Sequence, residues 1–176
     1  RLPCRAATRD VPTEFIDRCN VRMAWLRGKL GPRDMTELDR RLYGVADVSA
    51  VANREVAAWL REHTAPSDLV FIWGFEPVIY DLAEREPSSR YLYDVPQRVA
   101  WWKDRSRADL MVELRARPPR AFVVEHRDVF PVVTGDAIDS ADTLAKIPEL
   151  SAWLEMGYRR AVTIEDFDVW VRRSDS

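Results

Sequence analysis

Apolar residues recur at steps of three and four along several stretches of the chain, which is the pattern of amphipathic helices. The first such stretch runs from Thr13 to Leu30, and a short second helix is predicted after Pro32. The clearest pattern covers residues 49–63, where Ser49 is the expected N-cap. Three further helices are predicted: a short one after Pro77, a long one ending near Arg117, and one from Pro148 to a C-cap at Gly157.

Two continuous apolar runs, at 69–73 and 121–125, lack this periodicity and predict short strands that helices bury on both faces. Residues 90–93 are predicted to form another short strand between them. Near the C-terminus, residues 159–173 predict two strands about a tight turn at Glu165 and Asp166, because the second half alternates strictly. The final strand of this hairpin is expected at a sheet edge.

Strands that alternate with helices indicate an α/β fold with a mostly parallel sheet. Right-handed crossovers then favour a Rossmann-like three-layer α/β/α sandwich, with a C-terminal antiparallel edge hairpin and N-terminal helices in front of it. Residues 1–48 are expected to be an extended segment and helices that pack on the domain, and 49–176 the α/β soluble domain. The polar stretch 126–142 is predicted to be a long loop.

Composition narrows the function classes. The formal net charge is −2, which argues against a general nucleic-acid binder. Only three of the 27 basic residues are lysine (Lys29, Lys103 and Lys146), which fits either a coding bias or recognition of phosphates and carboxylates by arginine. The chain has no apolar run near 18 residues and no initiator methionine, so we expect it to be a piece of a longer chain.

The two cysteines, Cys4 and Cys19, lie close together in the sequence. A disulfide between them is plausible in an oxidising compartment, and two free thiols are plausible in the cytosol. With only His63 and His126 as histidines, no four-ligand zinc site is expected, and we predict no metal. His63 is expected in the last turn of its helix.

The stretch "VFIWGFEPVIYDLAE" (70–84) begins like a nucleotide-binding unit, since a strand runs into Gly74 and a helix follows. A dinucleotide site needs three spaced glycines, and only one is present. Glu76 would repel a phosphate, and Pro77 removes a donor N–H. We therefore expect no nucleotide cofactor, and Glu76 has a structural role available at the helix N-terminus.

Polar residues follow the predicted strands. Glu76, Asp94 and Glu125 are expected to converge at the C-terminal edge of the sheet, either as a three-carboxylate site or simply as polar strand ends. His126 follows the third strand as a further candidate or as an ordinary loop histidine.

Aromatic residues with nearby arginines gather around the first two predicted strands, where they would bind sugar rings or a lipid-linked phosphate, or else pack in the core. These aromatics are Trp73, Tyr80, Tyr91, Tyr93, Trp101 and Trp102, and the arginines are Arg85, Arg90 and Arg98. The candidate substrate-binding residues are Trp73, Gly74, Glu76, Tyr80, Arg90, Tyr93, Asp94, Glu125 and His126, and no catalytic residue is assigned.

The run "ANREVAAWLREHTAPSDLVFIWGFEPVIYDLAEREPSSRYLYDVP" (52–96) resembles the region after the last membrane helices of bacterial GT-C type polytopic glycosyltransferases, which are related to the dolichyl-phosphate-mannose and aminoarabinose transferases. The segments "RPPRAFVV" (117–124), "PELSAWLEMGYR" (148–159) and "TIEDFDVWVRR" (163–173) also look like that region. The resemblance covers roughly residues 40 to 173.

This resemblance implies a periplasmic or extracellular domain, anchored by membrane helices outside residues 1–176, whose parent enzyme uses a polyprenyl-phosphate-linked sugar donor. The family's catalytic carboxylate lies in a loop between the first membrane helices, so the domain is expected to be inactive alone and to help bind an acceptor or cap the membrane active site. Implied partners are the transmembrane part of the same polypeptide and a glycan or lipid-linked acceptor. The alternative is an autonomous Rossmann-like ligand-binding module or enzyme that uses carboxylates at the strand ends, and an interaction domain without a ligand also stays open.

Overall fold

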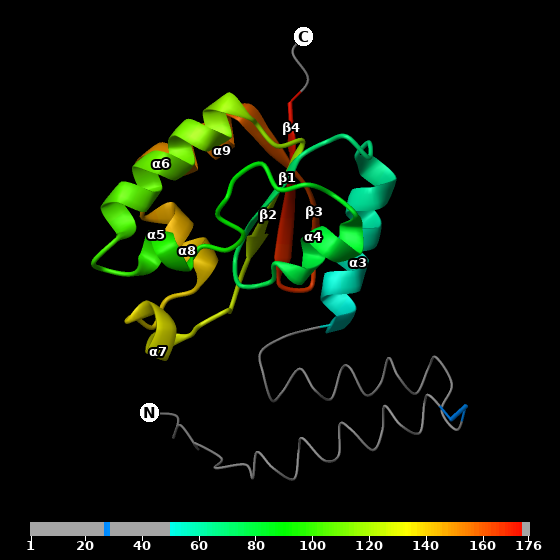
Figure 1. The fold of residues 1–176 in the computed structure, drawn as a ribbon, viewed down its shortest axis with the longest axis horizontal. Coiled ribbons are helices and arrows are strands. Elements are labelled where there is room, and N and C mark those ends of the chain that lie inside the picture. Colours follow the sequence, from blue (N-terminus) through cyan, green and yellow to red (C-terminus); the bar gives the residue numbers. More distant parts are fainter. Residues whose placement is uncertain (1–26, 29–49, 174–176) are drawn as a thin grey trace.

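The computed structural model describes residues 27–28 and 50–173. The helices predicted between residues 13 and 48, the N-cap at Ser49 and the cysteine pair lie outside the described residues. The described part is a mixed α/β fold in which helices cover a four-stranded sheet (Figure 1).

The elements follow the order that the sequence pattern indicates, with additional short helices. They are α3 (Ala50–His63), β1 (Val70–Trp73), α4 (Val78–Ala83), α5 (Val95–Arg98), α6 (Lys103–Ala116), β2 (Ala121–Glu125), α7 (Pro131–Thr134), α8 (Ser140–Ala145), α9 (Pro148–Gly157), β3 (Tyr158–Ile164) and β4 (Phe167–Arg172). The predicted helices α3, α4, α6 and α9 and the predicted strands β1 and β2 are confirmed, with small shifts at their ends.

The strands lie in the order β1-β2-β4-β3. β1 and β2 are parallel, with Val70 opposite Ala121 and Trp73 opposite Val124. β4 runs antiparallel to β2, and β3 runs antiparallel to β4. Helices α4, α5 and α6 form the long crossover that two parallel strands require.

The predicted mostly parallel sheet is wrong, because two of the three strand pairs in this sheet are antiparallel. The predicted strand at 90–93 does not form, since side chains bind its backbone amides. The N–H of Arg90 donates to the Glu113 carboxylate (3.0 Å), and the N–H of Tyr91 donates to the Ser89 hydroxyl (3.0 Å). Without that strand, the described sheet has one parallel pair, β1 and β2, and the C-terminal hairpin β3–β4 adds the other two strands. This arrangement does not establish a Rossmann-like fold.

The C-terminal hairpin is confirmed, and its turn lies at Glu165 and Asp166. The prediction that its last strand lies at the edge is wrong, because β4 lies between β2 and β3. β4 is buried along most of its length, whereas β3 exposes Arg159 and Arg160. Exposed charged side chains suit an edge strand, so β3 takes that position.

Two apolar cores lie on opposite faces of the sheet. Alternate residues of β1 supply them, Val70 and Ile72 to one face and Phe71 and Trp73 to the other. α3 and α4 cover the first face, and α6, α8 and α9 cover the second (Figure 1). Burial on both faces explains why β1 and β2 are continuous apolar runs.

Backbone groups on the outer side of β1 form hydrogen bonds with the segment that follows α4. Val70 N–H donates to the carbonyl of Glu86 (3.0 Å), and Ser88 N–H donates to the carbonyl of Val70 (2.9 Å). Ile72 N–H donates to the hydroxyl oxygen of Tyr80 (2.9 Å). Tyr80 therefore closes a buried sheet edge.

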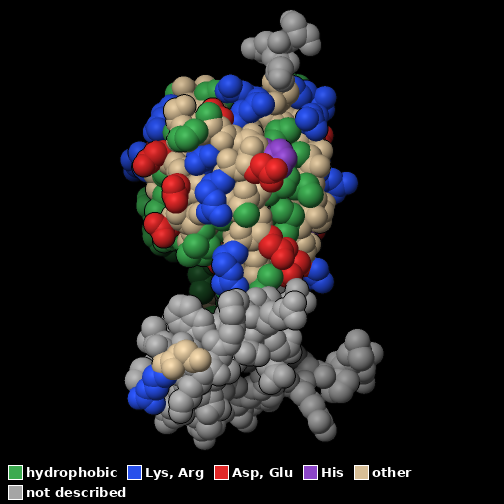
Figure 2. Space-filling model, turned by 90° about the vertical axis from the view of Figure 1, so that its right-hand side faces the viewer, with side chains coloured by type: hydrophobic (Ala, Val, Ile, Leu, Met, Phe, Trp, Pro, Cys, Tyr) green, Lys and Arg blue, Asp and Glu red, His purple; other side chains and the backbone are tan. Residues whose placement is uncertain are grey.

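Residues 126–142, predicted to be a loop, hold the short helix α7 and the start of α8, so that prediction is corrected. Asp139 caps α8 by accepting the N–H of Asp142 (2.8 Å). Gly157 is the last residue of α9, and the chain turns extended at Tyr158. In the described ranges, no helix has the length and apolar character needed to cross a bilayer. On the face that carries α3, acidic and basic side chains are interspersed (Figure 2).

Candidate functional site

A cluster of buried carboxyl groups lies at the C-terminal ends of the parallel strands. Glu125 ends β2, and Gly74 directly follows β1 beside it. The Glu125 carboxylate accepts the N–H of Phe75 (2.6 Å). A Cβ at position 74 would overlap with both Cβ and Oε2 of Glu125, so this close approach requires glycine. Gly74 thus serves the packing of Glu125.

Three more carboxylates surround Glu125. Glu76 accepts a hydrogen bond from the side-chain amide of Asn53 (2.5 Å). Asp94 lies near the hydroxyl of Ser140 (2.7 Å), and Asp128 accepts the Ser140 N–H (2.7 Å). All four carboxylate residues are at most 7% exposed. The structure therefore brings the predicted Glu76, Asp94 and Glu125 together, and adds Asp128.

The Ser140 hydroxyl lies between two of these acids and the guanidinium of Arg98. Its oxygen lies within hydrogen-bond reach of Asp94 and Asp128, and it accepts from the guanidinium of Arg98 (3.1 Å). A hydroxyl has one hydrogen to donate, so it satisfies one carboxylate only. Both close contacts are favourable together when one of the two carboxyl groups is protonated and donates to Ser140.

The environment of each acid also raises its pKa. Burial, reinforced by Asp128, Glu76 and Asp94, raises the pKa of Glu125 to about 9. Burial likewise raises the pKa of Asp94 to about 7, although Arg98 and Ser140 oppose the shift. Burial is also the main cause of the raised pKa of Glu76 and of Asp128. At neutral pH the cluster therefore carries fewer negative charges than it has carboxyl groups.

Arg98 supplies the positive charge beside this cluster. Its guanidinium lies 3.5 Å from Asp94, 3.9 Å from Asp128 and 3.5 Å from Asp136, and it lies over the ring of Phe75. No group of three or more metal-ligating side chains with suitable geometry occurs within the described ranges. The cluster is buried in this conformation, and its carboxylates anchor the guanidinium of Arg98.

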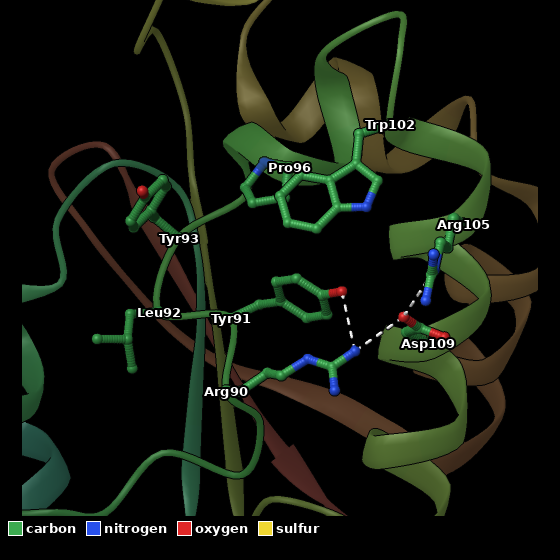
Figure 3. Close-up of a pocket in the computed structure, with 8 residues that line it drawn as sticks. All are labelled: Arg90, Tyr91, Leu92, Tyr93, Pro96, Trp102, Arg105 and Asp109. Carbon is green, nitrogen blue, oxygen red and sulfur yellow. Dashed lines mark hydrogen bonds and ion pairs between the residues drawn. The ribbon is translucent and has the colours of Figure 1, made fainter.

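An accessible pocket of about 660 Å³ lies next to α6 (Figure 3). Residues 90–96 form one side of it, and Trp102 with the first turns of α6 forms the other. Its lining consists of Arg90, Tyr91, Leu92, Tyr93, Pro96, Trp102, Arg105 and Asp109. We call this the aromatic pocket. It contains two of the predicted binding residues, Arg90 and Tyr93.

The aromatic pocket combines ring surfaces with fixed polar groups. Tyr91 is nearly buried and lies edge-on to Trp102, whereas Tyr93 and Trp102 are about two-fifths exposed at 42% and 39%. Arg90 donates to Asp109 (2.8 Å) and to the Tyr91 hydroxyl (3.2 Å), as Figure 3 shows. Apolar surfaces with a few oriented polar groups are typical of small-ligand sites.

The remaining predicted residues lie elsewhere. Trp73 is fully buried and donates to the Ser140 carbonyl (2.7 Å), and Tyr80 is buried at the edge of β1. His126 faces Asp168, with Nε2 3.2 Å from its carboxylate. Burial opposes ionisation of Asp168, but hydrogen bonds from Thr163 and other neighbours lower its pKa overall. The nine predicted residues therefore do not form one site.

Sequence reasoning missed two polar residues of the aromatic pocket, Arg105 and Asp109. Their spacing of four residues on a predicted helix was the available signal, since it places both side chains on one face. Reasoning from strand ends also missed Asp128 and Ser140, which lie beyond β2 in the chain.

No family model and no curated protein matches the chain. Among solved structures, it is similar to the C-terminal globular domain of an oligosaccharyltransferase from Archaeoglobus fulgidus. The two share 12% sequence identity with a TM-score of 0.40, over 68% of this chain and 95% of that chain. Likeness at this level carries no functional argument.

Proposed function

We propose that this chain is an extracytoplasmic domain of a membrane-embedded glycosyltransferase that uses a polyprenyl-phosphate-linked sugar, and that its aromatic pocket holds a ring of the glycan acceptor. The observation that carries the proposal is the pocket itself, an accessible hollow with exposed Tyr93 and Trp102 rings beside the Arg90 and Asp109 pair. The domain binds, and the chemistry belongs to the membrane part of the parent enzyme.

The chemistry of sugars supports this use of the pocket. A pyranose ring presents C–H groups on its faces and hydroxyl groups around its rim. The aromatic faces of Tyr93 and Trp102 can pack against the C–H groups of a sugar ring. The charged groups of Arg90 and Asp109 can form hydrogen bonds with its hydroxyl groups. A volume of about 660 Å³ accommodates a saccharide of more than one ring.

The sequence resemblance supports the cellular context. The segment that lines one side of the pocket, residues 90–96, lies within the stretch 52–96 that resembles membrane glycosyltransferases. In that setting the domain lies on the periplasmic or extracellular side of the cytoplasmic membrane, and its partners are the transmembrane part of the polypeptide and a lipid-linked or glycan acceptor.

The alternative, an autonomous enzyme that uses carboxylates at the strand ends, has less support. Glu76, Asp94 and Glu125 are 7%, 0% and 4% exposed, so a substrate would need the domain to open before it reached them. A catalytic acid or base must come within hydrogen-bond reach of its substrate.

Binding of oligosaccharides to the chain of residues 1–176 tests the pocket. Saturation-transfer NMR with a panel of neutral oligosaccharides should show transfer to sugar protons in the native chain. Trp102→Ala and Tyr93→Ala should each weaken binding about tenfold or more, by loss of a ring face. Trp59→Ala is the control, since it removes an indole on the other face of the sheet.

Absence of binding across the panel, or equal loss in Trp59→Ala, would contradict the proposed pocket. The membrane context is tested separately by the coding sequence around residues 1–176. It should encode several apolar segments of about 20 residues. A soluble reading frame confined to this domain would overturn that part of the proposal.

A further inference from the structure

A second pocket, of about 420 Å³, lies on another side of α6. Four of its seven lining residues are cationic. The lining consists of Arg98, Lys103, Arg107, Asp136, Ile138, Thr143 and Lys146. We call this the basic pocket. Two of the three lysines of the whole chain line it, although the chain has a net charge of −2.

The single carboxylate of the lining does not neutralise these cations. Asp136 forms an ion pair with Arg98 (3.5 Å), and Arg98 also forms ion pairs with Asp94 and Asp128. Asp136 therefore compensates a cation that already has two other carboxylate partners. Lys103 and Lys146 have no carboxylate partner within the part of the chain that the structure describes. Arg107 donates Nε–H to the carbonyl of Gln97 (2.9 Å), and no described carboxylate pairs with it.

Three positive charges thus line one pocket without a carboxylate partner among the described residues, whereas several arginines elsewhere in the domain are paired. Arg90, Arg115 and Arg160, for example, each lie within 3.2 Å of a carboxylate oxygen. Like charges that share a pocket repel one another. An anion that enters the pocket is therefore attracted by all three cationic side chains and reduces their mutual repulsion.

We propose that the basic pocket binds a phosphate group, as a monoester or a diphosphate. An ammonium group acts as a point charge for phosphate, and a guanidinium can bind two phosphate oxygens at once. A single carboxylate would compensate only one of the three free charges, whereas a diphosphate compensates more. The volume leaves room for a group attached to the phosphate.

The basic pocket is separate from the aromatic pocket. Trp102, Arg105 and Asp109 line the aromatic pocket, and Lys103 and Arg107 line the basic one. At 100° per residue these two sets lie on different faces of α6. The phosphate proposal therefore stands independently of the proposed glycan site.

Calorimetric titration of the 1–176 chain with sodium pyrophosphate at low salt tests the inference. Binding should be measurable and should weaken as salt rises. The double variant Arg107→Gln/Lys146→Gln should weaken it by about tenfold or more. Arg117→Gln is the control for loss of a cation outside the pocket, since Arg117 lies at the far end of α6, and it should leave binding unchanged. Circular dichroism and thermal melting establish that the variants fold.

Vesicles distinguish the source of the phosphate. The chain is sedimented with phosphatidylcholine vesicles with and without phosphatidic acid, a lipid phosphate monoester. Binding to phosphatidic acid that the double variant loses supports a lipid headgroup, and binding of pyrophosphate without vesicles supports a soluble phosphate. Failure of both probes to bind, or binding that the double variant retains, overturns the inference. Neither result depends on binding of oligosaccharides.

Discussion

The side chain of Glu125 occupies the space that any side chain at position 74 would need. Gly74→Ala should therefore displace Glu125 and the start of the chain after β1, and lower the free energy of unfolding by about 1–3 kcal/mol. Urea unfolding at pH 7 measures the change. Gly157→Ala is the control, because a Cβ there meets nothing within 4 Å. Equal stability of the two variants would show that position 74 has room.

Glu125→Gln should flatten the dependence of stability on pH. A free glutamate ionises near pH 4.5, whereas burial raises the pKa of Glu125 to about 9. Between these values the folded protein keeps a proton that the unfolded chain has lost, so the free energy of unfolding falls as pH rises. The slope from one such group approaches about 1.4 kcal/mol per pH unit. Urea unfolding at pH 5.5, 6.5 and 7.5 should give a steeper fall for the native chain than for Glu125→Gln, and parallel curves would contradict the assignment.

Removal of the buried positive charge of Arg98 should lower the free energy of unfolding more than removal of the Asp94 carboxylate. Arg98→Met leaves Asp94 and Asp128 without their buried positive partner and should lower stability by about 3–5 kcal/mol. Asp94→Asn should cost clearly less at pH 6, because the pKa of Asp94 is raised to about 7 and the acid is already largely neutral there. Chemical denaturation at pH 6 compares the two variants. A larger loss for Asp94→Asn would show that Asp94 is ionised in the folded protein.

Asp109→Asn should separate stability from binding. The Arg90 and Asp109 pair is exposed, so its loss should change the free energy of unfolding by less than about 1 kcal/mol. If Asp109 orients Arg90 in the aromatic pocket, the affinity for an oligosaccharide should still fall several-fold. Glu149→Gln is the control, since it breaks a comparable exposed pair with Arg115 outside both pockets. An unchanged affinity in Asp109→Asn would remove Asp109 from the binding site.

Local pattern was enough to predict the core elements. β1 and β2 are continuous apolar runs because helices bury both of their faces, and that cause is visible in the sequence. The segment 90–93 has the aromatic content of a strand, yet Glu113 of α6 and Ser89 hold its backbone amides. A contact between residues 23 positions apart in the chain leaves no periodic signal, so the sheet was predicted with too much parallel pairing.

The sequence also predicts one part of the candidate sites and not the rest. Convergence of Glu76, Asp94 and Glu125 follows from the rule that parallel strands end at one edge. The aromatic pocket depends on how residues 90–96 lie against α6, and the basic pocket depends on how α8 lies against α6. These arrangements are set by packing between distant segments, and the sequence pattern indicates only the residue types available to them.

The two borders of the sheet also affect how the domain behaves at high concentration. Outer backbone groups of Val70 and Ile72 in β1 are bonded by Tyr80, Glu86 and Ser88. At the other border, β3 combines exposed Arg159 and Arg160 with a register shift between Arg160 and Val162. A second chain that adds as a strand needs a flat border with open amide and carbonyl groups and little charge. We therefore expect the sheet of this domain to resist edge-to-edge aggregation.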